Sequence, residues 1–202
     1  MQIPSDFAQV LLNAIEQANY FANGTNQVML FGRSKITAAG LFSSGLPSFI
    51  DDLLLQLENI CRAFVSPEVH TKLFSSGTTN PPRSRQVILN RYHPGEGITP
   101  HVDLLQRYDD GIIGVSLGSG CAMDFKQVES SDAQETSLWL PENSIIILEG
   151  DARYNWTHGI RALHGDVVED ELIGGVKWIP RGMRTSITLR WLLPGADIVG
   201  SE

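Results

Sequence analysis

Hydrophobic positions recur with one period in the N-terminal third of the chain and with another period beyond it. Across residues 7–21 the apolar side chains are spaced three and four apart, which predicts an amphipathic helix with Ser5 as its N-cap. A second stripe of this kind predicts a helix over about 47–64, closed near Pro67. The run NQVMLFG, residues 26–32, lies between them and predicts a strand.

Beyond the turn-rich segment SSGTTNPPRSR the chain consists of short β-rich runs separated by Gly, Pro, Asn and Asp. These runs are QVILNRY, GIIGVSLG, CAMDFKQV, TSLWL, SIIIL and RTSITLRWLL. Many short strands predict a mainly β sandwich or barrel. The acidic stretch GDVVEDELIGG, residues 165–175, predicts a loop by its composition. No repeat or linker interrupts the pattern, so we expect one domain over residues 1–202.

Composition and charge remove several classes of protein. With 202 residues, 42% of them hydrophobic, the chain is neither disordered nor collagen-like. Its 15 Lys and Arg against 23 Asp and Glu give no bulk attraction to nucleic acid or an anionic membrane, so a nucleic-acid contact needs a local basic patch. Cys61 and Cys121 form neither a disulfide framework nor a zinc motif. Without an export signal or an apolar membrane span, we expect an intracellular protein, cytoplasmic or nuclear.

Two histidines are each followed, two residues later, by an aspartate. On a strand, the two side chains of such a pair point to the same face and can chelate one metal ion. We interpret His101 and Asp103 as a pair of this kind. A facial triad needs a further imidazole, and His158 supplies it from a distant segment, after a buried-looking strand. No histidine follows the second pair, His164 and Asp166, in an acidic loop, so we interpret that pair as solvated surface residues.

The last β-rich run carries two arginines on one face. Period-2 alternation places Arg184, Thr188 and Arg190 together, and two guanidiniums facing one cavity indicate a dicarboxylate ligand. The alternative is that these arginines pair with Asp or Glu of adjacent strands. Asn90 and Tyr92 share a face on the run before the metal pair, where they can donate neutral hydrogen bonds to the same ligand.

Four linked segments then resemble the AlkB-like branch of the Fe(II) and 2-oxoglutarate dependent dioxygenases. They are NRYHPGEGITPHVD, SLGSGCAMDF, RYNWTHGI and RGMRTSITLR. The similarity runs from about Asn26 to Trp191. Within the family, WTHGI and RGMRTSITLR are most similar to the branch that hydroxylates a modified wobble uridine of transfer RNA.

The resemblance implies a fold, a set of cofactors and a site. The fold is a double-stranded β-helix, or jelly roll, with N-terminal helices packed on it, and the cofactors are Fe(II), 2-oxoglutarate as co-substrate and O2. The implied iron ligands are His101, Asp103 and His158. The implied 2-oxoglutarate residues are Arg184 and Tyr92 at the C5 carboxylate, with Asn90, Thr188 and Arg190 around the C1 end.

The expected substrate is a modified nucleobase in transfer RNA or another single-stranded nucleic acid, hydroxylated or oxidatively demethylated. Residues that could stack on a base or contact its backbone, each with an alternative structural role, are Phe31, Arg33, Tyr108, Arg153 and Tyr154. The acidic balance, and a length that leaves no room for RNA-binding modules, favour an alternative in which the same chemistry acts on a protein side chain or a small molecule. A further alternative is a non-catalytic jelly-roll binding protein.

Overall fold

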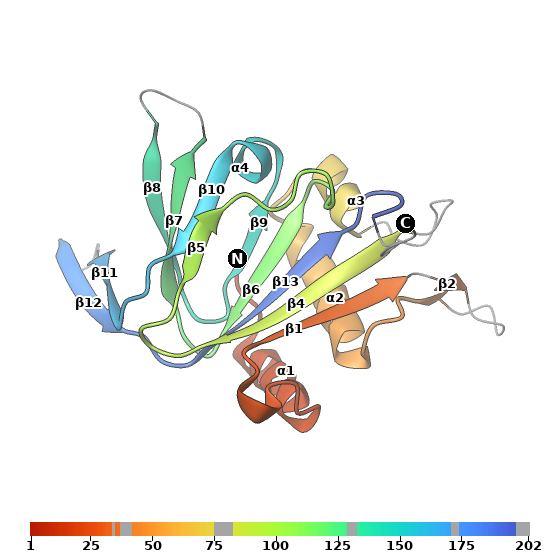
Figure 1. Cartoon of the computed structure of the whole chain (residues 1–202), viewed down its shortest axis with the longest axis horizontal. Helices are drawn as coiled ribbons and strands as arrows, with labels where there is room; N and C mark the ends of the chain where they lie inside the picture. The colour runs from red at the N-terminus through yellow and green to blue at the C-terminus, as the bar shows by residue number, and fades with distance from the viewer. Residues whose placement is uncertain (34, 37–41, 75–82, 129–132, 171–173, 197–202) are drawn as a thin grey trace.

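Two antiparallel sheets face each other in the computed structural model, which describes residues 1–33, 35–36, 42–74, 83–128, 133–170 and 174–196 (Figure 1). The helices are α1 (Ser5–Gln17), α2 (Ser48–Cys61), α3 (Pro67–Phe74) and α4 (Gly150–Tyr154), with a 3-10 turn at Ala22–Gly24. The strands are β1 (Gln27–Arg33), β2 (Lys35–Ile36), β3 (Phe42–Ser43), β4 (Ser84–Tyr92), β5 (Ile98–His101), β6 (Ile112–Leu117), β7 (Cys121–Gln127), β8 (Glu135–Leu140), β9 (Ile145–Leu148), β10 (Trp156–Ile160), β11 (Gly165–Asp170), β12 (Gly175–Pro180) and β13 (Arg184–Trp191).

The larger sheet has the strand order β1-β4-β13-β6-β9, and α1 and α2 cover its outer face (Figure 1). Alternate residues of β4 and β13, such as Leu89 and Ile187, are fully buried in one cluster with Leu11 of α1 and Leu53 of α2. Burial of this face leaves the intervening residues of both strands on the inner face. The mainly β fold with N-terminal helices packed on it is therefore confirmed.

The smaller sheet has the order β5-β10-β7-β8. A second apolar cluster joins the two sheets on the inside, where Met123 and Phe125 of β7 and Ile160 of β10 pack with Ile112 of β6 and Leu148 of β9. This cluster closes one part of the space between the sheets, and the polar side chains described below occupy the other part. None of the helices in the described ranges combines the length and apolar character that crossing a bilayer requires.

Three local predictions were wrong. Ser5 is the first residue of α1 rather than its cap, since Pro4 holds the N-cap position. Pro67 begins α3 rather than closing α2, because proline suits the first helical position, where its missing N–H is not needed; the Ser66 hydroxyl accepts a hydrogen bond from the Val69 amide there. The acidic stretch predicted as a loop contains β11, which pairs with β12 in a hairpin.

Candidate metal centre and co-substrate pocket

The two predicted histidine ligands lie opposite each other on neighbouring strands. His101 ends β5 and pairs with His158 of β10, and their ring centroids are 4.5 Å apart. The register shifts within β5 just before His101, and such a bulge re-aims a side chain. Gly159 lets β10 approach closely, because a Cβ there would lie 2.9 Å from the Cα of Pro100. Local backbone geometry thus brings both imidazoles to one point.

Asp103 completes the cluster from the loop after β5. One ligand atom from each of His101, Asp103 and His158 lies within 4.8 Å of the others. The Asp103 carboxylate is only 5% exposed, and its two oxygens have different neighbours. Oδ1 accepts a hydrogen bond from Arg190 Nη1, whereas Oδ2 lies 3.8 Å from His158 Nε2. One oxygen is therefore fixed by the guanidinium, and the other faces the space between the imidazoles.

Each histidine has a ring nitrogen that can act as a metal ligand. Burial lowers the pKa of His158 to about 4, although the Asp103 carboxylate acts in the opposite direction, so this imidazole is neutral near pH 7. Nδ1 of His101 lies 2.9 Å from the Thr99 carbonyl, which can only accept a hydrogen bond. His101 therefore carries its proton on Nδ1 and keeps Nε2 as its ligand atom, an arrangement common around bound metals.

Arg184 lies on the inner face of β13, in the larger sheet, and is only 7% exposed. Its Nε and Nη2 donate to the Ser116 hydroxyl at 3.2 and 2.9 Å, and its guanidinium lies over the Tyr92 ring at 5.5 Å. Nη1 is buried and has no hydrogen-bond partner among the described residues. Burial raises the pKa of the Tyr92 phenol and of the neighbouring Cys121 thiol, so neither neutralises the arginine. A buried guanidinium with an unused donor fits a carboxylate ligand.

The two arginines of β13 therefore have different partners. Arg190 pairs with Asp103 of the loop after β5, not with an acidic residue of an adjacent strand, and it lies over the Tyr108 ring at 4.1 Å. Between them Thr188 shares the inner face. Ser186 of β13 is registered with Asn90 of β4. The Asn90 Oδ1 atom accepts a hydrogen bond from Gln27, which leaves its amide nitrogen as the group that could donate to a ligand. All five predicted co-substrate residues thus lie on β4 and β13.

The pair His164 and Asp166 does not form a second metal centre, but the solvated-loop interpretation was wrong for its carboxylate. Asp166 lies in β11, is 3% exposed and accepts two hydrogen bonds of 2.6 Å from Arg181. His164 is exposed, and its ring covers Gly95. Burial of this aspartate follows from its guanidinium partner, which composition alone did not indicate.

The five predicted nucleic-acid contacts divide into two groups. Tyr108 and Arg153 are buried and support the loop that follows Asp103. Phe31 is 51% exposed, and Tyr154 and Arg33 are also exposed. The sequence interpretation missed Ser116, the hydrogen-bond partner of Arg184. Ser116 stands in the quoted SLGS segment, which was the available signal.

A jelly roll with two histidines and a carboxylate beside a buried arginine defines the class of non-haem iron oxygenases. Residues 43–190 match the 2OG-Fe(II) oxygenase superfamily, and the chain belongs to it. Fe(II), 2-oxoglutarate and O2 are the cofactor and co-substrates of this family. The ligand set and the unpaired Arg184 donor fit that cofactor and co-substrate.

Sequence comparison finds relatives of this chain, and structure comparison finds a solved structure with the same fold. The chain is 39% identical over 115 residues to the mouse protein named tRNA (carboxymethyluridine(34)-5-O)-methyltransferase ALKBH8, covering 52% of this chain and 17% of that protein. It is 43% identical over 105 residues to the uncharacterized protein L905 of Acanthamoeba polyphaga mimivirus, covering 52% of this chain and 47% of that protein. The crystal structure of a Pseudomonas putida prolyl-4-hydroxylase shares the fold, with a TM-score of 0.50 and 12% identity over 94% of this chain and 88% of that chain. The chain thus spans less than half the length of the mouse and the mimivirus relatives.

Proposed function

We propose that this chain is an Fe(II) and 2-oxoglutarate dependent dioxygenase that hydroxylates or oxidatively demethylates a modified nucleobase in RNA or single-stranded DNA. His101, Asp103 and His158 would hold the iron, and Arg184 with Tyr92 would bind the C5 carboxylate of 2-oxoglutarate. Asn90, Thr188 and Arg190 would line the C1 end. The observation that carries the proposal is the convergence of the three ligand atoms within 4.8 Å, together with a buried arginine on the facing sheet that has an unused donor.

Bound iron with 2-oxoglutarate and O2 supplies the oxidising power of the reaction, and the protein supplies geometry. Arg184 orients the co-substrate through a charge-assisted contact, and its neutral neighbours preserve its charge for that ligand. Arg190 holds one oxygen of Asp103 and leaves the other as the oxygen that would bind the metal.

The nucleobase assignment rests on the edge strand β1. Its residues Val28 and Leu30 pack against the helices, so that Met29 and Phe31 belong to the inner face. Phe31 is registered with Gln86 of β4, and Gln86 with Arg190 of β13. Phe31 thus lies two strands, about 10 Å, from the arginine that binds Asp103. A half-exposed aromatic at this distance can stack on a base whose modified group reaches the metal.

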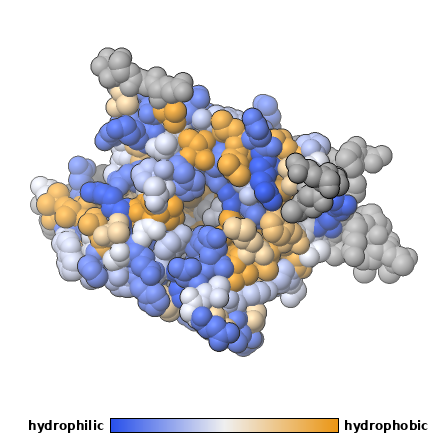
Figure 2. Space-filling view, viewed as in Figure 1, coloured by the Kyte–Doolittle hydropathy of each residue, from blue (hydrophilic) through white to orange (hydrophobic). Residues whose placement is uncertain are grey.

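Apolar side chains also lie on the loop after Asp103. Leu104 and Leu105 are both exposed, next in sequence to the metal ligand. Figure 2 shows orange patches on either side of a central hollow on this face of the molecule. The name of the mouse relative is that of a transfer RNA modifying enzyme, which agrees with a nucleobase substrate. The region of similarity covers only 17% of that mouse protein.

The test of this function is succinate release with three separate substrate pools. Purified chain loaded with Fe(II) and 2-oxoglutarate would be given RNA, single-stranded DNA or peptides, with Asp103→Ala as the inactive control. We expect stimulation by a nucleic acid that depends on Asp103. Stimulation by peptides alone would contradict the nucleobase assignment, and no dependence on Asp103 would contradict the metal centre.

The net charge of −8 favours a second candidate, in which the same oxygenase chemistry acts on a protein side chain or a small molecule. An acidic surface weakens attraction to a polyanion. The same three pools, extended with a metabolite pool, decide between the two candidates.

We also propose that residues 1–202 form a single oxygenase domain, since α1 packs in the same cluster as β13. The two cysteines are free and buried, in keeping with a reducing compartment, cytoplasmic or nuclear.

A further inference from the structure

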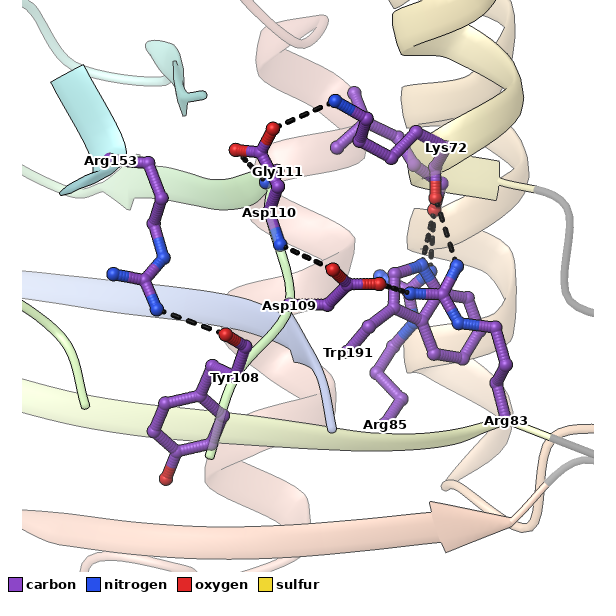
Figure 3. Close-up of polar contacts among 10 residues, drawn as sticks. Lys72, Arg83, Arg85, Tyr108, Asp109, Asp110, Gly111, Arg153 and Trp191 are labelled. Atoms are coloured by element: carbon purple, nitrogen blue, oxygen red, sulfur yellow. Dashed lines mark hydrogen bonds and ion pairs between the residues drawn. The ribbon is translucent and has the colours of Figure 1, made fainter. Parts of the chain in front are cut away.

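Arg153 is a buried arginine whose partners are backbone carbonyls. It is 2% exposed and lies in α4, five residues before His158. Its Nη1 donates to the Asp103 carbonyl at 3.0 Å, and its Nη2 donates to the carbonyls of Tyr108 at 3.1 Å and Leu104 at 3.3 Å. Figure 3 draws the contact with Tyr108. None of the ion pairs found among the described residues involves this guanidinium.

These contacts join two segments that each carry a proposed metal ligand. One segment is the loop that begins at Asp103, whose own carbonyl accepts the Nη1 hydrogen bond. The other is α4, which leads directly into β10 and His158. The two segments are 50 residues apart at this contact. This side chain therefore ties the Asp103 backbone to the helix that leads into the strand of the second histidine.

The far end of the same loop is held by several contacts of its own (Figure 3). Asp109 pairs with Arg83, and Asp110 pairs with Lys72 of α3 at 2.7 Å. Asp110 also accepts a hydrogen bond from the Gly150 amide at 2.9 Å. The end near Asp103 rests instead on the carbonyl contacts of Arg153 and on the Arg190 contact with the carboxylate. Loss of Arg153 should therefore displace Asp103 more than it displaces residues 109–111.

We infer that Arg153 is a positioning residue of the metal centre. It fixes the main chain of Asp103 so that the carboxylate Oδ2 faces His158, and it acts without touching metal or substrate. Groups that orient metal ligands change metal affinity by 10- to 100-fold in other proteins. The inference rests on the proposed metal ligands and is independent of the substrate.

The experiment compares Arg153→Met, Arg153→Lys and Arg83→Met with the unaltered protein, using Co(II) as a spectroscopic probe in the absence of turnover. Arg83→Met is the matched control, because it removes contacts of the same network at the end far from Asp103. Co(II) affinity, the visible ligand-field spectrum and the melting temperature are measured for each variant. We expect Arg153→Met to weaken Co(II) binding about 10- to 100-fold with an altered spectrum, and Arg153→Lys to weaken it less.

Arg83→Met is expected to lower the melting temperature while Co(II) affinity stays within about twofold. Folded Arg153 variants with unaltered affinity and spectrum would overturn the inference, and so would an Arg83→Met protein that loses Co(II) in proportion to its stability. Should Arg153→Met fail to fold, Arg153→Lys decides, since it keeps the buried charge and loses the fork that reaches three carbonyls. Equal Co(II) binding by the unaltered protein and by Asp103→Ala would instead contradict the metal centre itself.

Discussion

The chain contains the pattern His-x-Asp twice, and the two copies have different environments. In the first copy, one oxygen of the Asp103 carboxylate accepts a hydrogen bond from Arg190, and the other oxygen faces His158. At the second copy both oxygens of Asp166 accept hydrogen bonds from Arg181, at 2.6 Å each. One carboxylate keeps an oxygen available for a metal, whereas the other is fully used by a guanidinium.

The difference lies in what surrounds each pair. A bidentate guanidinium neutralises a carboxylate and uses both of its oxygens, so Asp166 anchors the β11–β12 hairpin to the sequence that leads into β13. A single guanidinium contact leaves Asp103 half-satisfied next to two imidazoles. The same short pattern can thus produce a structural ion pair or a metal centre, and the neighbouring strands decide which.

Removal of the first carboxylate should have the largest effect. Asp103→Ala deletes a proposed ligand, so we expect Fe(II) affinity to fall by more than about 100-fold, beyond the range seen for groups that only orient ligands. Succinate production should fall to background. Metal binding by calorimetry checks the prediction, with Asp103→Asn as a variant of similar shape. Retention of Fe(II) affinity by a folded Asp103→Ala protein would contradict it.

Removal of the second carboxylate should affect stability instead. Asp166→Asn leaves Arg181 buried beside a neutral amide, and breaking a buried ion pair costs about 3–5 kcal/mol. We expect the midpoint of urea unfolding to fall while Fe(II) affinity is unchanged. The double variant Asp166→Leu with Arg181→Met should recover part of the loss, because it removes both charges. A loss of metal by Asp166→Asn at a temperature where it is folded would show that the two copies are not independent.

Arg184 extends the comparison to the co-substrate. Arg184→Met removes a charge-assisted contact worth about 1.5–3 kcal/mol, so the Kd of 2-oxoglutarate should rise roughly tenfold to a hundredfold. Fe(II) affinity should stay close to that of the unaltered protein, and Arg184→Lys should show a smaller loss. Parallel losses of iron and 2-oxoglutarate in a protein that melts normally would mean that Arg184 belongs to the metal centre.

Phe31 should give the smallest effect and tests the substrate side of the site. Phe31→Ala removes a proposed stacking surface worth about 1–3 kcal/mol per base, so the KM for the nucleic-acid substrate should rise. The affinities for iron and 2-oxoglutarate should not change, and Phe31→Tyr should behave like the unaltered protein. An unchanged KM for Phe31→Ala would remove this residue from the substrate site.

Much of this arrangement could be predicted because alternation and spacing are local properties. The alternation along β4 and β13 already placed Tyr92 and Arg184 on inner faces, and the third histidine separated the two His-x-Asp copies. The bulge before His101 and the choice of Asp103 as the partner of Arg190 depend on contacts between distant strands. The burial of Asp166 depends in the same way on Arg181, so composition indicated a loop where the chain forms a hairpin.

The most direct test of the metal centre is an anaerobic titration of the protein with Fe(II) in the presence of 2-oxoglutarate, followed by absorption spectroscopy. A metal-to-ligand charge-transfer band should appear in the visible range and saturate at one Fe(II) per chain. It should be absent from Asp103→Ala and present in Asp166→Asn. A protein that shows no such band with both components, or a band of equal strength in Asp103→Ala, would contradict the assignment of His101, Asp103 and His158.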